Sequence, residues 1–161
     1  TWHTLKFSPY NWANKPLIIY VYSSSNGNED FETKTTWWFV GIYASCDNLV
    51  RKSQWKVIQD RKRLWGGKWI IAGDFNDILS NEEKWGGRWR EEKSFSDFKN
   101  FINDNQMVDI GFERNPWTWS NNWEEIGEVR ERLDRGLYSL DWSLLWEKIK
   151  MHTCGYLRVR S

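Results

Sequence analysis

Hydrophobic runs bounded by turn residues predict the strands in the first half of the chain. Leu17–Tyr22 is a run of β-branched and aromatic residues, and Trp37–Tyr43 has the same character. The polar stretch Ser23–Thr36 between them is interpreted as a long hairpin connection, so we expect two buried strands that pair in the antiparallel sense. Lys68–Gly73 predicts a further buried strand.

Apolar residues at helical spacing predict two longer helices. Leu49–Leu64 spreads its apolar residues through charged sequence and is followed by two glycines, which indicates an amphipathic helix with a defined end. Phenylalanines recur at helical spacing over Phe95–Ile102, with Ser94 as the expected N-cap. We interpret this phenylalanine face as core packing and not as a binding site.

The second half of the chain predicts shorter elements. Strands are expected at Met107–Ile110, Trp117–Ser120 and Leu133–Tyr138, a brief helix at Leu140–Trp146 and a last strand at Met151–Val159. Hairpins and β-helix-β connections therefore occur in one chain. This mixture predicts an α/β domain in which mixed sheets are faced by helices.

Composition adds mainly exclusions. The 161 residues hold 23 Lys+Arg and 22 Asp+Glu, so no global positive field marks a nucleic-acid binder, and any phosphate must be met locally. Two cysteines, Cys46 and Cys154, exclude a disulfide scaffold and a zinc cluster and favour a reduced, intracellular protein. No apolar run reaches the roughly 18 residues of a membrane span. A length of 161 residues favours one domain.

Fourteen tryptophans are an unusual number for this length. Tryptophans could serve as stacking platforms of a carbohydrate-binding module, which is one hypothesis for the excess. That hypothesis explains none of the ordered polar motifs described next, so we assign most tryptophans to core and loop packing.

The sharpest polar feature follows the Lys68–Gly73 strand, where Asp74 and Asn76 stand two residues apart. Alternation along a strand would place both side chains on one face, the carboxylate able to take a proton or bind a hard cation and the amide able to stabilise an oxyanion. The alternative is an Asx turn that merely ends the strand.

Six short motifs in fixed order make the chain similar to a known group of enzymes. The chain resembles the endonuclease/exonuclease/phosphatase superfamily, and in particular the apurinic-endonuclease-like domain that precedes reverse transcriptase in plant LINE-type retrotransposons. The motifs are Gly73–Leu79, Glu83–Gly87, Phe95–Phe98, Val108–Phe112, Trp117–Asn121 and Arg130–Arg135.

The resemblance implies a DNase I-like four-layered α/β sandwich of two mixed β-sheets flanked by helices. It also implies that residues 1–161 form a partial domain, without the N-terminal strands that carry a metal-binding glutamate and without the C-terminal Ser-Asp-His segment. His3 and His152 do not replace the missing histidine, because neither matches its motif.

The resemblance also implies roles for individual residues. Asp74 would activate the attacking water and Asn76 would steady the scissile phosphate, and both would lie at the metal. Tyr43 would donate a hydrogen bond to the same phosphate, although Ala44–Cys46 follows it where the family has Gly-x-Pro. Asp134 would orient the catalytic histidine.

Three further residues are expected to contact the substrate. Trp119 matches an aromatic side chain on the hairpin that faces DNA, and Arg132 and Arg135 are candidate phosphate contacts. The loop Lys84–Arg90 combines basic and tryptophan residues, so it could touch a DNA backbone, although a solvated loop is the more frequent explanation.

The function implied by the resemblance is metal-dependent hydrolysis of phosphodiester bonds, as the DNA-nicking domain of a retrotransposon polyprotein. Mg²⁺ is the expected ion, with Mn²⁺ as the substitute. The expected partners are DNA and a reverse transcriptase domain of the parent polyprotein, in a monomer located in the nucleus of a eukaryote. Because two parts are absent, we expect impaired turnover. The alternative is a catalytically dead remnant that acts as a nucleic-acid-binding scaffold.

Overall fold

The structure is a computed structural model, and it describes residues 8–12, 15–25, 34–123 and 127–143. The chain order is β1 Ser8–Trp12, β2 Lys15–Ser25, β3 Lys34–Tyr43, α1 Asn48–Trp65, β4 Trp69–Asp74, β5 Lys84–Trp85, α2 Ser96–Asp104, β6 Met107–Asp109, β7 Trp119–Ser120, β8 Arg130–Glu131, β9 Asp134–Ser139 and α3 Leu140–Ser143. None of the described helices is long and apolar enough to span a membrane.

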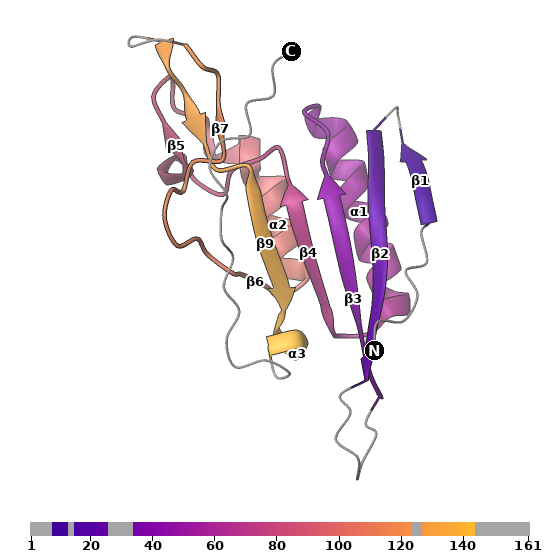
Figure 1. The fold of residues 1–161 in the computed structure, drawn as a ribbon. Coiled ribbons are helices and arrows are strands. Elements are labelled where there is room, and N and C mark those ends of the chain that lie inside the picture. The colour runs from indigo at the N-terminus through magenta and orange to yellow at the C-terminus, as the bar shows by residue number, and fades with distance from the viewer. Residues whose placement is uncertain (1–7, 13–14, 26–33, 124–126, 144–161) are drawn as a thin grey trace.

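Most strands belong to one six-stranded sheet with the order β1-β2-β3-β4-β9-β6 (Figure 1). β3 and β4 are parallel and are joined through α1, whereas the other neighbours are antiparallel. The predicted antiparallel pairing of β2 with β3 is confirmed. The carboxyl ends of β3 and β4 and the start of β9 therefore meet at one end of the sheet.

Helices α1 and α2 lie against the same face of this sheet (Figure 1). The side chains of Ile71 and Leu137 are fully buried in the layer below the helices. Trp55 of α1 stacks on Phe98 and Phe101 of α2, with ring centroids 5.5 and 4.7 Å apart. The expected phenylalanine face of the second helix is thus core packing, and it fixes both helices on the sheet.

The second sheet has three short strands in the order β5-β8-β7, and all its pairings are antiparallel. It lies beyond the end of the large sheet at which β4 ends and β9 begins (Figure 1). The α/β class and a mixed sheet are therefore confirmed. Within the described residues, the six-stranded sheet is mixed, whereas the three-stranded sheet is antiparallel throughout.

Some local predictions differ from the structure. β1, β5 and β8 were not predicted, because they are short or polar. Ser94 is not the N-cap of α2: it lies in a 3₁₀ turn, and its hydroxyl accepts a hydrogen bond from Arg90 Nε at 3.1 Å. The predicted strand Met151–Val159 lies outside the described residues, as does the end of the helix predicted at Leu140–Trp146.

The N-cap of α1 provides a test of local stability. Asp47 Oδ1 accepts hydrogen bonds from the backbone nitrogens of Leu49 at 2.8 Å and Val50 at 3.2 Å. Because Asp47→Ala leaves both donors without this partner, we expect a loss of about 1 kcal/mol in the free energy of unfolding, measured by urea denaturation. Asp60→Ala, in the middle of the same helix, is the matched control, and an equal loss in both variants would contradict the capping role.

Candidate active site

Three residues of the expected site lie in one row across the sheet. Tyr43 of β3 is in register with Asp74 of β4, and Asp74 is in register with Asp134 of β9. Residues in register on neighbouring strands point to the same face and lie about 5 Å apart. The fold therefore brings together side chains that are far apart in the sequence, at the end of the sheet described above.

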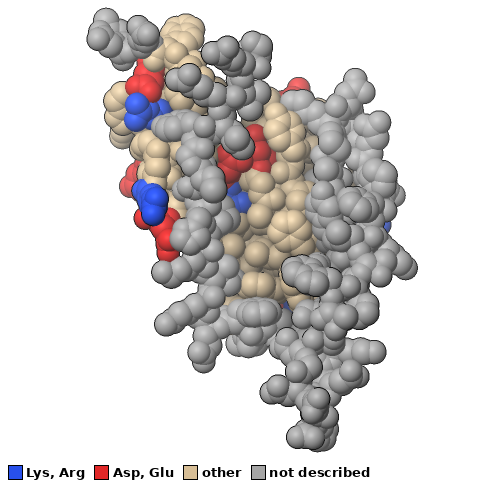
Figure 2. Space-filling view, in the orientation of Figure 1, with Lys and Arg blue, Asp and Glu red and all other residues tan. Residues whose placement is uncertain are grey.

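The face that carries this row is the one opposite α1 and α2. Immediately behind the row, Gly41, Ala72 and Gly136 are in register on the same three strands. No side chain larger than a methyl group therefore stands directly behind Asp74 and Asp134 on these strands. Figure 2 shows this face, with acidic side chains gathered towards one end of the exposed strands.

Gly73 explains how β3 and β4 approach each other beside Asp74. Its φ angle is +138°, and a Cβ atom at this position would overlap the carbonyl oxygen of Ile42. Beyond the last strand residues, Ala44 N donates to Asp74 O at 2.7 Å and Phe75 N donates to Leu133 O at 2.9 Å. The glycine and these bonds fix the backbone of Asp74 between its two neighbours.

Asn76 is positioned by a turn and not by strand alternation. The prediction that alternation along a strand places Asp74 and Asn76 on one face is therefore wrong. β4 ends at Asp74, and Asn76 has a φ angle of +49°. Asn76 N donates to Asp74 Oδ1 at 2.7 Å, so the Asx turn is present. Asn76 Nδ2 donates to Ala44 O at 2.7 Å, and Asn76 Oδ1 accepts from Cys46 Sγ at 3.4 Å. The turn therefore holds the Asn76 side chain against the loop after Tyr43.

Asp134 is tied to the hairpin that carries Trp119. The hydroxyl of Thr118 accepts hydrogen bonds from the backbone nitrogens of Leu133 and Asp134, both at 2.9 Å. Trp119, the next residue, is 42% exposed. An exposed indole is therefore connected through one residue to the row of candidate catalytic side chains.

Arg132 and Arg135 have a different role from the expected phosphate contacts. Arg132 is 7% exposed and Arg135 is fully buried. Arg132 pairs with Glu83 at 3.1 Å and with Asp109 at 2.7 Å, and Arg135 binds both carboxylate oxygens of Glu83, at 2.9 and 2.7 Å. The two guanidinium groups on either side of Asp134 are thus engaged inside the protein. Sequence analysis missed Glu83 and Asp109 as their partners.

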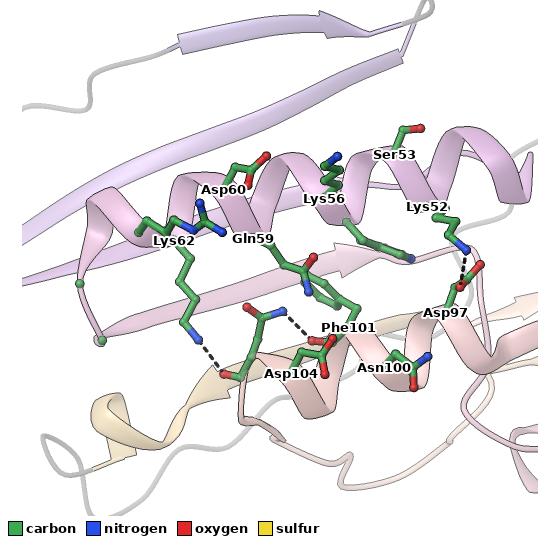
Figure 3. Close-up of a pocket in the computed structure, with 15 residues that line it drawn as sticks. Lys52, Ser53, Lys56, Gln59, Asp60, Lys62, Asp97, Asn100, Phe101 and Asp104 are labelled. Atoms are coloured by element: carbon green, nitrogen blue, oxygen red, sulfur yellow. Dashed lines mark hydrogen bonds and ion pairs between the residues drawn. The ribbon is translucent and has the colours of Figure 1, made fainter.

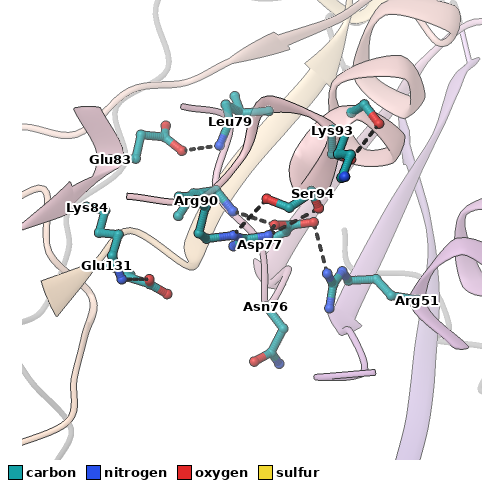
Figure 4. A network of polar contacts seen from close by, with 12 residues as sticks. Arg51, Asn76, Asp77, Leu79, Glu83, Lys84, Arg90, Lys93, Ser94 and Glu131 are labelled. Carbon is teal, nitrogen blue, oxygen red and sulfur yellow. Dashed lines mark hydrogen bonds and ion pairs between the residues drawn. The ribbon is translucent and has the colours of Figure 1, made fainter. Parts of the chain in front are cut away.

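The basic loop after β4 is also largely engaged within the protein. Lys84 pairs with Glu131 at 2.8 Å, and Arg90 pairs with Asp77 at 2.9 Å (Figure 4). Trp85 carries a guanidinium group over its ring, that of Arg130, at 5.2 Å. These contacts favour the interpretation of the loop as a structural element over a basic DNA contact.

The oxygen-rich end of the sheet suits a hard cation only in part. Carboxylates of Asp74 and Asp134 are the ligand type that Mg²⁺ prefers. In the part of the chain that the structure describes, however, no group of three or more His, Cys, Asp or Glu residues could hold a metal ion. The described residues therefore supply an incomplete ligand set.

A groove lies elsewhere, between α1 and α2 on the helical side of the sheet (Figure 3). Its volume is about 1080 Å³. Lys52 pairs with Asp97 across it at 2.9 Å, and Lys62 Nζ donates to Asn105 O at 3.3 Å. The sheet separates this groove from the row formed by Tyr43, Asp74 and Asp134. The groove is therefore not part of the candidate site.

Comparison with known proteins places the fold. No family model matches the chain, and no curated protein matches it. The endonuclease domain of TRAS1, a telomere-specific non-LTR retrotransposon, is similar with a TM-score of 0.55 and 16% identity over 85% of this chain and 57% of that domain. TDP2 of D. rerio, complexed with a single-strand DNA product, gives a TM-score of 0.49 and 14% identity over 86% of this chain and 52% of that chain. TDP2 of Caenorhabditis elegans gives a TM-score of 0.48 and 12% identity over 86% of this chain and 40% of that chain.

The chain thus spans somewhat more than half of the TRAS1 endonuclease domain, at an identity that speaks for the fold alone. The match agrees with the α/β architecture described above. This chain has a DNase I-like α/β fold.

Proposed function

We propose that this chain is part of a nuclease that hydrolyses phosphodiester bonds in DNA. The observation that carries the proposal is the register of Tyr43, Asp74 and Asp134 on three neighbouring strands, with Asn76 folded against the end of the first. A proton acceptor, hydrogen-bond donors for a phosphate and a second carboxylate thereby meet at one end of the sheet. In-line attack on a phosphodiester needs these groups.

Each side chain has a proposed task. Asp74 takes the proton of the attacking water, while its Oδ1 atom stays fixed by the Asn76 backbone. Two groups donate hydrogen bonds to the oxygens of the scissile phosphate: the Asn76 amide and the Tyr43 hydroxyl. Tyr43 is 45% exposed, so its hydroxyl is accessible to a substrate. Asp134 holds the imidazole of a histidine in the full natural polypeptide, which protonates the leaving oxygen.

A divalent ion is part of the proposal. Mg²⁺ would offset the negative charge that develops on the phosphate, and Mn²⁺ could replace it. Asp74 would supply ligand oxygen, with Asn76 Oδ1 beside it. The ligand set would be completed by residues of the full natural polypeptide, in agreement with the incomplete set among the described residues.

We also propose a setting for the enzyme. Its similarity to the endonuclease domain of a non-LTR retrotransposon supports DNA as the substrate, and we propose that a reverse transcriptase domain belongs to the same polyprotein. We propose that the protein acts on nuclear DNA as a monomer.

Supercoiled plasmid DNA provides the test of this function. The full natural polypeptide is expected to convert it to nicked circles in the presence of Mg²⁺ and to stop when EDTA is added. The 161-residue chain alone is expected to be slower, since it spans 57% of the similar domain. Supercoiled DNA that stays intact with the full polypeptide and Mg²⁺ would contradict the proposal.

Trp119 is expected to affect binding more than turnover. Its indole is exposed on β7, and the preceding residue, Thr118, accepts a hydrogen bond from Asp134 N. Trp119→Ala should raise the KM for DNA by about 5- to 100-fold, the range expected when one stacked base is lost, with a smaller change in kcat. Trp123→Ala, which removes another exposed tryptophan, is the control in steady-state nicking assays. An unchanged KM for Trp119→Ala would argue against a substrate contact.

A second candidate function is nucleic-acid binding without cleavage. The loop after Tyr43 favours it, because Ala44–Cys46 stands where the family that the chain resembles has Gly-x-Pro. This scaffold would bind DNA with the same affinity with or without Mg²⁺ and would leave the plasmid supercoiled. Mg²⁺-dependent nicking that disappears on replacement of Asp74 would exclude it.

A further inference from the structure

A buried ion cluster lies directly behind the turn that carries Asn76. Asp77 is 2% exposed, and two arginines bind its two carboxylate oxygens. Arg51 Nη2 lies 3.0 Å from Asp77 Oδ2, and Arg90 Nη2 lies 2.9 Å from Asp77 Oδ1. Figure 4 shows the two arginines approaching Asp77 from opposite sides, with Asn76 on the neighbouring backbone. The sequence motifs assign no role to the side chains of Arg51 and Asp77.

Arg51 also binds the other loop of the candidate site. Its Nη1 atom donates to Ser45 O at 2.8 Å and to Cys46 O at 3.1 Å, and its side chain is 6% exposed. One buried guanidinium group therefore joins the loop after Tyr43 to the turn after Asp74. A planar fork of donors can make these contacts at once, whereas a lysine ammonium cannot.

These contacts surround the hydrogen bond that fixes the Asn76 side chain. Asn76 Nδ2 donates to the carbonyl oxygen of Ala44. The next residue, Ser45, supplies a carbonyl oxygen that Arg51 binds. Asp77 follows Asn76 directly, so its attachment to Arg51 limits how far the turn can move. Asn76 itself has a φ angle of +49°, in the left-handed region that asparagine adopts more readily than most residues and that the Asx turn requires here.

We propose that Arg51 and Asp77 are positioning residues for the hydrolysis proposed above, on which this inference rests. Neither touches the substrate. They hold the amide of Asn76 and the loop of Tyr43 at a fixed separation, so that both donors meet the same phosphate.

Arg90 offers a matched control for Arg51. It binds the same carboxylate of Asp77 at almost the same distance, but its other guanidinium hydrogen bonds go to Ser94, at 3.1 Å to the hydroxyl and 3.2 Å to the carbonyl oxygen, and it lies 5.7 Å from the centre of the Phe95 ring. It donates no hydrogen bond to the loop after Tyr43. Arg51→Lys and Arg90→Lys therefore make the same chemical change on the two sides of Asp77, and only the first separates the two loops of the site.

The test compares both variants in the full natural polypeptide by steady-state DNA nicking and thermal unfolding. Arg51→Lys is expected to lower kcat by about 10- to 100-fold, the cost of misplacing a reacting group by about 1 Å, with KM within about twofold of wild type. Arg90→Lys should keep kcat within about threefold. Equal kcat losses in both variants, or none in Arg51→Lys, would overturn the inference while wild-type nicking still supports the proposed function.

Two further measurements keep the inference testable. If Arg51→Lys does not fold, the paired variant Arg51→Met/Asp77→Asn removes both buried charges together, and it is expected to show the same loss of kcat. The side-chain amide resonances of Asn76, assigned with Asn76→Asp in ¹H–¹⁵N spectra, do not depend on turnover. They should shift in Arg51→Lys and stay in place in Arg90→Lys, and resonances unmoved by Arg51→Lys would overturn the positioning role even if the wild type cut no DNA.

Discussion

Asp74→Asn is expected to lower the rate of Mg²⁺-dependent DNA nicking by about 10²- to 10⁴-fold, the usual contribution of a general acid or base. The change keeps the size of the side chain and an oxygen that can accept the hydrogen bond from Asn76 N, now 2.7 Å long. It removes the negative charge, and with it the ability to take a proton or to hold a hard cation. The fold should therefore persist while turnover is lost.

Steady-state nicking rates and thermal unfolding of the same preparations measure this effect. Asp97→Asn is the matched control, because Asp97 lies on α2, on the far side of the sheet, with a side chain that is 46% exposed. The control should nick DNA at the wild-type rate. A variant Asp74→Asn that retained more than about a tenth of the wild-type rate would exclude Asp74 as the base, given the magnitude above.

Arg135→Met is expected to cause a large loss of stability, about 3–5 kcal/mol in the free energy of unfolding, as for a buried ion pair that loses one partner. Arg135 is fully buried and binds Glu83 through both of its terminal nitrogens. Its guanidinium group also lies 5.2 Å from the centre of the Phe98 ring. Methionine fills much of the same space but removes two charged hydrogen bonds from the Glu83 carboxylate, which keeps those from Arg132 and from Leu79 N.

Urea denaturation measures this loss. Lys93→Met is the control, because Lys93 and Glu91 form an ion pair with side chains that are 84% and 72% exposed. Exposed pairs contribute little, so no measurable change is expected for the control. If Arg135→Met were as stable as the control, the ion pair between Arg135 and Glu83 would have no part in anchoring β9 at the site.

Much of the fold follows from hydrophobic periodicity. The run at β2 forms the strand that its pattern indicates, and the runs at β3 and β4 and the helical spacing of α1 and α2 bury apolar residues in the core. The short strands β5 and β8 gave no such signal, because two residues cannot show a period and their polar side chains pair across the small sheet.

The candidate site was predictable only where a motif marks it. Tyr43 ends a predicted strand, Asp74 directly follows one and Asp134 is the second residue of another, and the structure brings the three into register. Arg132 and Arg135 show the limit, since a basic residue beside a catalytic motif looks the same in sequence whether it faces a phosphate or a buried carboxylate. Their partners Glu83 and Asp109 lie at least 23 residues away, too far for any local pattern.

The described tryptophans include buried residues of the core and exposed residues. Trp55 and Trp69 are at most 4% exposed and belong to the core, as expected for most of the fourteen. Trp85, Trp89 and Trp123 are between 47% and 79% exposed, on or near the small sheet. Core tryptophans have neighbours that explain them, and two of these three have one contact each, Trp85 with Arg130 and Trp123 with the backbone of Gly127.

The central claim is that the row formed by Tyr43, Asp74 and Asp134 is the place where DNA and metal meet. A crystal structure of the full natural polypeptide with Mn²⁺ and a short DNA duplex tests it directly, because the anomalous signal of manganese locates the ion. We expect a manganese peak at ligand distance from a carboxylate oxygen of Asp74, with a DNA phosphate at the Asn76 amide and the Tyr43 hydroxyl. A manganese ion and phosphate bound elsewhere, with this end of the sheet in contact with neither, would contradict the account.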